Sequence, residues 1–205
     1  MGILIAGTHS GCGKTTVSMG IMAALSARGI ALAPFKVGPD YIDPGFHEYV
    51  TGQKSHNLDA YMLSTSNLKY LYAKYAQGKC AIIEGVMGMF DGYGIDSVAS
   101  SAHVSKITGT SVILVIDGKG VSTSAAATVK GFVDFDPGVN IAGVIVNRVS
   151  NDTHYRMIQS AVETHTGIPC LGYLPKEECI VLNSRHLGLI PHGEIGDLDE
   201  RIQRL

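Results

Sequence analysis

The chain has 205 residues, a formal net charge of −2 and a pI near 6.4. A chain with this net charge lacks the positive field that would indicate nucleic acid or an anionic membrane surface as the main partner. The 45% hydrophobic share and 25 glycines favour one compact α/β domain with many tight turns. No apolar run reaches the length of a membrane span, and the first expected strand starts almost at Met1, so we expect a cytoplasmic protein without a signal peptide. The four cysteines show no CxxC spacing, which favours free thiols over a zinc site or disulfides.

A glycine-rich loop at residues 7–16 follows a strand-like apolar run at 3–6 and precedes an apolar segment of helical length at 17–25. Strand, glycine loop and helix in this order are typical of a phosphate-binding loop, whose backbone N–H groups face phosphate oxygens. The leading glycine is Gly7, so the loop is one residue longer than the GxxxxGK pattern. The flanking strand and helix disfavour the alternative, a glycine-rich turn without a ligand. We predict nucleotide binding by Thr8, His9, Ser10, Gly11, Cys12, Gly13, Lys14, Thr15 and Thr16.

Two side chains of this loop supply the chemistry that a bound nucleotide needs. Lys14 offers a positive charge for the β- and γ-phosphates, and the Thr15 hydroxyl is placed to ligate Mg²⁺. The sequence therefore predicts a nucleoside triphosphate site with a magnesium ion.

The second expected strand, residues 30–36, ends at Lys36 and runs into a loop with two carboxylates, two prolines and a glycine. In an open parallel sheet the loops at the carboxyl ends of the strands border the ligand crevice. We therefore expect Lys36, Asp40 and Asp43 to face the same site as the phosphate loop. Composition alone leaves open that this loop is only a solvated turn.

A buried strand at residues 80–84 ends in Glu84, and a second glycine-rich loop follows at 85–94. An acidic residue at the end of an apolar strand is where P-loop enzymes place a magnesium anchor, so we predict that role for Glu84. Asp91 in the second loop has two open interpretations, a contact with substrate or metal and a role in the turn.

The remaining patterns alternate between helix and strand. Residues 46–52, 67–77, 97–108, 122–132 and 152–166 favour helices, and residues 111–117, 141–148 and 169–175 favour strands. The polar segment 55–59 has no clear pattern, while 184–191 and 197–205 suggest an edge strand and a final helix. The alternation predicts an α/β fold of the P-loop NTPase type, with a parallel sheet and helices on both faces.

Taken together, the motifs resemble the amidoligase domain of the cobyrinic acid and nickel-sirohydrochlorin a,c-diamide synthase family. The phosphate loop is also similar to that of dethiobiotin synthetase, a wider relative. The stretches with this resemblance span nearly the whole chain: AGTHSGCGKTT at 6–16, FKVGPDYIDP at 35–44, NLD at 57–59, EGVMGMFDG at 84–92, VNR at 146–148 and RHLGL at 185–189.

The resemblance implies ATP-dependent amidation of the a- and c-acetate side chains of a tetrapyrrole, either cobyrinic acid or nickel-sirohydrochlorin. In that chemistry a substrate carboxylate attacks the γ-phosphate, and ammonia then displaces phosphate from the acyl phosphate. The negative charge that develops would be neutralised by Lys14, Lys36 and Mg²⁺, with Mg²⁺ held by Thr15, Asp40 and Glu84.

Further roles follow only from the resemblance. Asp43 and Asp91 match family positions near the substrate, where they would act as catalytic residues that orient the reacting groups. Asn147 would recognise the nucleotide base, with Pro175 near its edge. Relatives of this fold often pair, so a homodimer is one expected assembly.

One feature of the family has no counterpart here. Its members continue into a glutaminase domain whose cysteine nucleophile lies in a glycine-flanked elbow, and no cysteine of this chain has that setting. We expect residues 1–205 to form one amidoligase domain. Its nitrogen would come from free ammonia or from a glutaminase domain outside these residues.

Three other interpretations remain open. One is a carboxylate-activating ligase of the dethiobiotin synthetase kind, although the segment 38–44 favours the tetrapyrrole branch. Another is a switch ATPase of the chromosome-partitioning type, which His9 disfavours because those proteins have a lysine early in the loop. The third is a nucleotide-binding module without catalysis.

Overall fold

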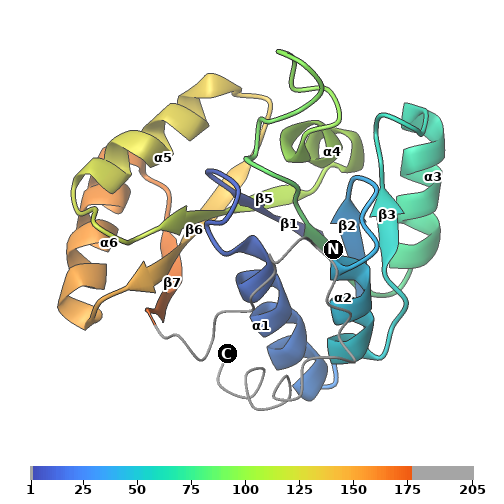
Figure 1. Cartoon of the computed structure of the whole chain (residues 1–205), viewed down its shortest axis with the longest axis horizontal. Coiled ribbons are helices and arrows are strands. Elements are labelled where there is room, and N and C mark those ends of the chain that lie inside the picture. Colours follow the sequence, from blue (N-terminus) through green and yellow to red (C-terminus); the bar gives the residue numbers. More distant parts are fainter. Residues whose placement is uncertain (1, 177–205) are drawn as a thin grey trace.

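The computed structural model describes residues 2–176, whose strands form one parallel sheet in the order β3-β2-β4-β1-β5-β6-β7 (Figure 1). The predicted α/β fold with a parallel sheet is therefore confirmed. The strands are β1 (Gly2–Gly7), β2 (Leu32–Val37), β3 (His56–Leu58), β4 (Cys80–Glu84), β5 (Ser111–Asp117), β6 (Ile141–Val149) and β7 (Cys170–Pro175). The helices are α1 (Lys14–Ala27), α2 (Asp43–Thr51), α3 (Thr65–Ala76), α4 (Ser101–Thr108), α5 (Ser124–Phe135) and α6 (Asp152–Thr166).

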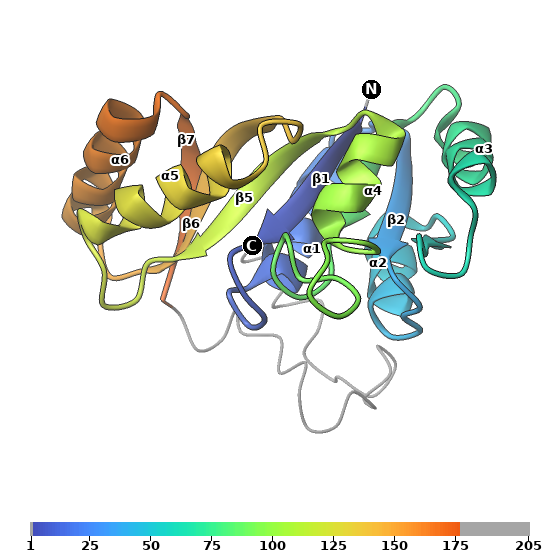
Figure 2. The ribbon, with the colours of Figure 1, turned by 90° about the horizontal axis from the view of Figure 1, so that it is seen from above.

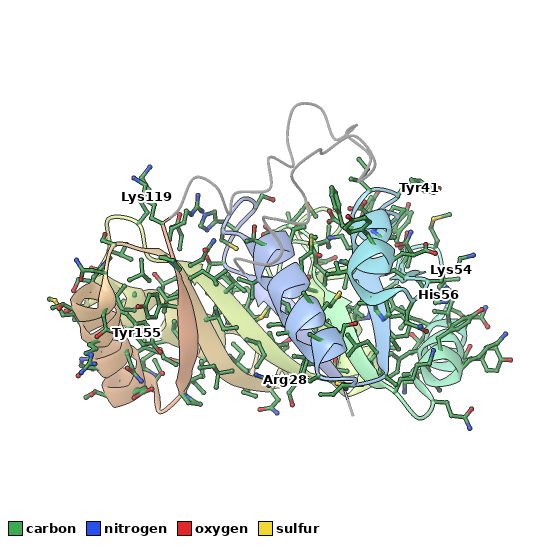
Figure 3. All side chains as sticks on the ribbon, turned by 90° about the horizontal axis from the view of Figure 1, so that it is seen from below. Arg28, Tyr41, Lys54, His56, Lys119 and Tyr155 are labelled. Atoms are coloured by element: carbon green, nitrogen blue, oxygen red, sulfur yellow. The ribbon has the colours of Figure 1, made fainter. Side chains whose placement is uncertain are left out.

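Apolar layers cover both faces of the sheet. On one face Val17 and Met22 of α1 pack against the sheet, and α1 and α2 lie across this face in Figure 3. On the other face Leu68 of α3, Val129 of α5 and Ile158 of α6 belong to a larger cluster, and Figure 2 shows α4 and α5 in front of the strands. Burial on both faces explains why the strands are continuous apolar runs rather than alternating ones.

Most expected elements are present, and the differences have local causes. Segment 55–59, which had no clear pattern, contains β3, a three-residue edge strand too short for a periodic signal. Helix α4 begins at Ser101 rather than 97, because the Ser100 side chain accepts a hydrogen bond from His103 N at 3.2 Å and caps it. The strand expected at 184–191 and the helix expected at 197–205 lie outside the described residues.

The sheet order determines which loops meet. All strands are parallel, so their carboxyl ends lie at one edge, and β4 is flanked by β1 and β2. In this register Glu84 is paired with both Ile5 and Lys36. Figure 3 shows Tyr41 and Lys119 at this carboxyl edge, with Arg28 at the opposite edge. The ends of β1, β2 and β4 thus converge at the carboxyl edge.

Membrane insertion through a helix finds no support in residues 2–176. None of the helices there combines the length and the apolar character needed to cross a bilayer.

Candidate functional site

The phosphate loop connects β1 to α1 and is braced by its neighbours. Gly13 adopts a φ of 100°, and any Cβ there would collide with the side-chain amide of Asn147, so only glycine fits. Met89 N in the β4–α4 loop donates a hydrogen bond to Gly7 O at 2.8 Å, and Figures 1 and 2 both show the two loops side by side. The Lys14 ammonium folds back over the loop and donates to His9 O at 3.3 Å. The loop is thus held in shape by contacts within the protein.

The end of β6 supports the same loop from the other side. Asn147 is buried, donates from Nδ2 to Cys12 O at 2.9 Å and accepts from Arg148 N at Oδ1. Arg148, with a φ of 60°, donates to Gly11 O at 2.6 Å and pairs with Asp117 at 2.8 Å. The structure thus gives Asn147 a contact with the loop backbone, while recognition of a base by Asn147 stays a prediction.

Glu84 is fully buried at the end of β4 and is held by side chains from three other elements. The Thr15 hydroxyl donates to Oε1 at 2.6 Å, and His47 Nε2 lies 2.7 Å from Oε2. Because an ionised carboxylate can only accept, Nε2 provides the proton of the second hydrogen bond. Lys36 Nζ lies 3.6 Å from Oε1. The predicted metal anchor is therefore joined directly to the phosphate loop through Thr15.

Lys36 lies at the centre of a cluster with more negative than positive groups. Its ammonium donates to Gly85 O at 2.8 Å and lies 3.0 Å from Asp43 Oδ2 and 3.9 Å from Asp40 Oδ2. With Glu84, one buried lysine faces three carboxyl groups. Such an excess of acceptors attracts further positive charge to this position.

The pKa values of the cluster reflect that excess. Burial alone would raise the pKa of Glu84, but the charge of Lys36 and the hydrogen bonds from His47 and Thr15 outweigh it and lower the pKa to about 2. Burial, followed by the charge of Glu84, raises the pKa of Asp43 to about 8, although Lys36 opposes the shift. Burial opposes protonation of Lys36, yet Glu84 and Asp43 outweigh it and raise its pKa. Glu84 is thus ionised at neutral pH, whereas Asp43 retains a proton.

Other predicted site residues lie around this centre. Asp91 Oδ2 accepts a hydrogen bond from Gly88 N at 2.8 Å, which supports its interpretation as a turn residue, and its catalytic role stays a prediction. Pro175 ends β7 and pairs with Val149, just beyond Asn147 on β6. A position of Pro175 near the edge of the nucleotide base thus stays a prediction.

Magnesium fits part of the predicted ligand set. The Thr15 hydroxyl and the Glu84 carboxylate offer adjacent hard oxygen atoms, the type that Mg²⁺ prefers together with water and phosphate oxygens. Asp40 Oδ1 already accepts from Ile42 N and Asp43 N at the start of α2, while its Oδ2 faces Lys36. Within residues 2–176 no three His, Cys, Asp or Glu side chains form a ready metal cage. The Thr15 and Glu84 oxygens thus fit part of a magnesium ligand set, and binding of Mg²⁺ stays a prediction.

Sequence reasoning missed His47 and Ser55. His47 is completely buried, and its Nδ1 lies 3.0 Å from the Ser55 hydroxyl, which fixes the ring that holds Glu84. One signal was available, because His47 follows Asp43 by four residues and a helix places both on one face. A lone histidine in a helix nevertheless has no sequence feature that identifies its partner.

The geometry of the phosphate loop and its neighbouring side chains identifies a class of protein. A glycine loop between the first strand and its helix, with a lysine, a hydroxyl and a buried acid on the adjacent strand, is the arrangement of P-loop nucleotide-binding domains. The chain belongs to the family described as CobQ/CobB/MinD/ParA nucleotide binding domain, which matches residues 3–189.

Curated relatives similar to this chain are named cobyrinate a,c-diamide synthase. The relative from Listeria innocua is 50% identical over 206 residues, covering 99% of this chain and 46% of the relative. The relative from Salmonella typhimurium is 51% identical over 189 residues, covering 91% of this chain and 41% of the relative. The chain thus spans slightly less than half the length of these relatives.

Solved structures share the fold at low sequence identity. A ParA family ATPase from Chlorobium tepidum superposes with a TM-score of 0.57 at 13% identity, covering 87% of this chain and 86% of that chain. Chloroplast FtsY from Physcomitrella patens gives a TM-score of 0.58 at 16% identity, covering 82% of this chain and 56% of that chain. These likenesses confirm the P-loop NTPase-type fold.

The raised pKa of Asp43 predicts a pH-dependent stability of the metal-free protein. Between pH 3.8 and about 8 the folded chain retains a proton that the unfolded chain has lost, so stability falls as pH rises. Asp43→Asn removes this loss, and we expect the variant to exceed the wild type in free energy of unfolding by about 1 to 3 kcal/mol at pH 8. Urea denaturation with a chelator would measure the difference, which should shrink towards pH 4. A constant difference from pH 4 to 8 would contradict the shift.

The contact between His47 and Glu84 predicts a difference between two conservative substitutions. Glutamine can place an N–H near the position of Nε2, whereas asparagine is too short and leaves the buried carboxylate with an unmet acceptor. We expect His47→Asn to lower the free energy of unfolding at pH 7 by about 1 to 3 kcal/mol and His47→Gln to lower it by less. Equal losses in urea denaturation would show that the Nε2 contact does not matter.

Proposed function

We propose that this chain is the ATP- and Mg²⁺-dependent amidoligase part of a cobyrinate a,c-diamide synthase. The observation that most supports the proposal is the direct connection between the phosphate loop and the Lys36 cluster, because Glu84 Oε1 accepts from Thr15 and lies 3.6 Å from Lys36. A carboxylate substrate beside the cluster would therefore lie next to the γ-phosphate. The relatives' name supplies cobyrinate as the substrate.

The reaction has two steps. An oxygen of a substrate acetate attacks the γ-phosphorus of ATP, the bond from this phosphorus to the ADP oxygen breaks, and ADP leaves with that electron pair. The nitrogen of ammonia then attacks the acyl carbon, the bond from this carbon to the phosphate oxygen breaks, and inorganic phosphate leaves. The nitrogen loses a proton to a base, which leaves a neutral amide.

Lys14 and Lys36 oppose the charge repulsion of the first step. Two anions must approach each other, and the Lys36 ammonium is already fixed by Gly85 O and Asp43, so it needs no reorganisation to stabilise the transferring phosphoryl group. Thr15, Glu84 and Asp40 would hold Mg²⁺, which when bound adds positive charge beside the β- and γ-phosphates.

Asp43 is suited to the proton transfer of the second step. A pKa of about 8 leaves a fraction of Asp43 ionised near neutral pH, and this ionised fraction can accept the proton. We assign Asp91 to orientation of the substrate from the neighbouring loop, and Asn147 with Pro175 to the base of ATP. These assignments extend the roles that the sequence resemblance implied.

The nitrogen source, assembly and location belong to the same proposal. Because the chain spans less than half of the relatives, we assign glutamine hydrolysis to a glutaminase domain outside these residues, with free ammonia as the donor for this domain alone. A homodimer in the cytoplasm is the expected form. Cobyrinic acid is favoured over nickel-sirohydrochlorin because the similar relatives are named for cobyrinate.

Mass spectrometry of the product tests the proposal. The chain would be incubated with Mg²⁺, ATP and either cobyrinic acid or nickel-sirohydrochlorin, with ammonium in one tube and glutamine in another. We expect mono- and diamide from cobyrinic acid with ammonium only. ATP hydrolysis that never yields amide would contradict the proposal and favour the switch ATPase.

Glu84→Gln tests the role of the buried acid in the same assay. Removing its charge weakens the anchor for Mg²⁺ and the fixed position of Lys36, so we expect amide formation to fall about 100-fold. Glu48→Gln is the matched control, because Glu48 is exposed on α2. Equal rates in both variants would show that the Lys36 cluster is idle.

A further inference from the structure

His47 is a buried polar side chain that takes no part in the proposed reaction. It lies on α2 without exposure to solvent, and both of its ring nitrogens have a polar partner. Nε2 lies 2.7 Å from Glu84 Oε2, and Nδ1 lies 3.0 Å from the Ser55 hydroxyl. A neutral ring that donates from Nε2 can only accept at Nδ1, so the Ser55 hydroxyl provides the proton of the second hydrogen bond. Ser55, which is also buried, thus holds the ring in one tautomer and one orientation.

The contact with His47 fixes the direction of the two oxygens of Glu84. Oε1 accepts from the Thr15 hydroxyl at 2.6 Å and therefore faces the phosphate loop, whereas Oε2 faces α2. The helices α1 and α2 lie next to each other (Figures 1 and 3), and the carboxylate connects them. Because each oxygen is directed to a different helix, Glu84 cannot turn both oxygens towards one ion unless its hydrogen bond with His47 breaks.

Asp40, the other carboxylate of the predicted ligand set, is restricted in a similar way. Its Oδ1 accepts from Ile42 N at 2.8 Å and from Asp43 N at 3.2 Å, which fixes this oxygen to the start of α2. Its Oδ2 lies 3.9 Å from Lys36 Nζ and thus faces the Lys36 cluster. Each of the two carboxylates can therefore offer one oxygen to an ion, and the Thr15 hydroxyl can offer another.

Magnesium and calcium differ in what they require from carboxylate ligands. Mg²⁺ is small, demands octahedral geometry and keeps several waters, so a few single oxygens from the protein are sufficient beside the phosphate oxygens of a nucleotide. Ca²⁺ is larger, takes more oxygen ligands and often binds both oxygens of one carboxylate. A site whose carboxylates each present a single oxygen is therefore better suited to Mg²⁺ than to Ca²⁺.

We infer that His47, supported by Ser55, is a positioning residue that makes the nucleotide site selective for Mg²⁺ over Ca²⁺, an inference that rests on the proposed function. By engaging Oε2, His47 limits Glu84 to one oxygen for the ion that accompanies the nucleotide. Without this hydrogen bond Glu84 can turn both oxygens to the ion, which removes a disadvantage of Ca²⁺. His47 thus acts on the ion only through Glu84.

Nucleotide binding with either ion tests this role without any turnover. A non-hydrolysable ATP analogue would be titrated into the chain by calorimetry, once with saturating Mg²⁺ and once with saturating Ca²⁺. The Kd with Ca²⁺ divided by the Kd with Mg²⁺ gives the selectivity ratio, and we expect it to exceed unity in the wild type. His47→Asn should reduce this ratio ~10-fold, since residues that orient a metal ligand act on this scale. His47→Gln keeps an N–H donor and should retain most of the ratio.

Two further variants separate orientation of Glu84 from general stability. Ser55→Ala leaves the histidine in place but removes the hydroxyl that fixes its ring, so the ratio should lie between those of the two His47 variants. Thr51→Val is the matched control, because the Thr51 hydroxyl donates to His47 O at 2.7 Å and supports the same helix through its backbone. Thr51→Val should weaken the helix and leave the ratio unchanged.

The outcomes distinguish this inference from the proposed function. Equal weakening of both complexes in His47→Asn and Ser55→Ala would show a purely structural role and overturn the inference, as would unchanged ratios or a wild type without preference for Mg²⁺. If His47→Asn shows no cooperative thermal unfolding, Ser55→Ala decides alone. Selectivity that depends on these residues, without amide formation by the wild type, would sustain the inference and reject the proposed reaction. Amide formation by the wild type with unchanged ratios in the variants would do the reverse.

Discussion

Glu84 carries a carboxylate that has no exposure to solvent, and the geometry of the site depends on how its charge is satisfied. Its partners come from three elements, with Thr15 on α1, His47 on α2 and Lys36 on β2. Loss of the charged partner Lys36 would destabilise the buried carboxylate by about 3 to 5 kcal/mol, and loss of one hydrogen bond to it by about 1 to 3 kcal/mol, so these contacts hold the three elements to β4. The same contacts fix the hydroxyl and the lysine that a nucleotide requires. The contacts of one buried carboxylate therefore stabilise the fold and also position the side chains of the site.

The phosphate loop is braced from two sides, by the β4–α4 loop and by the end of β6. On the β4 side Met89 N donates to Gly7 O, and on the β6 side Asn147 and Arg148 donate to Cys12 O and Gly11 O. These contacts occupy carbonyl oxygens of Gly7, Gly11 and Cys12, so the loop is tied to its neighbours through its own backbone. Binding of an anion to a loop that is already shaped has a lower entropic cost than binding to a flexible one.

Sequence patterns predicted the parts of the fold that repeat a simple physical rule. Apolar runs identified the buried strands, and a charged residue at the end of a run placed Lys36 and Glu84 at the carboxyl edge before any contact was known. β3 was missed because three residues of an edge strand give no periodicity. The partners of Glu84 were missed in part because the packing of α2 against α1 and β2 brings His47 to Glu84, and no local pattern encodes that packing. The left-handed backbone at Arg148 was equally hidden, since a positive φ is expected at glycine and not at arginine.

On the proposed function, phosphoryl transfer needs charged groups that are held rigidly beside the nucleotide. Dense polar contacts meet this requirement, because Lys36 and Glu84 are buried and each makes several charge-assisted interactions. Because β4 lies between β1 and β2, the phosphate loop and the Lys36 cluster meet at one edge of a single sheet. The order of the strands therefore places the charged cluster next to the loop that would hold the transferring phosphoryl group.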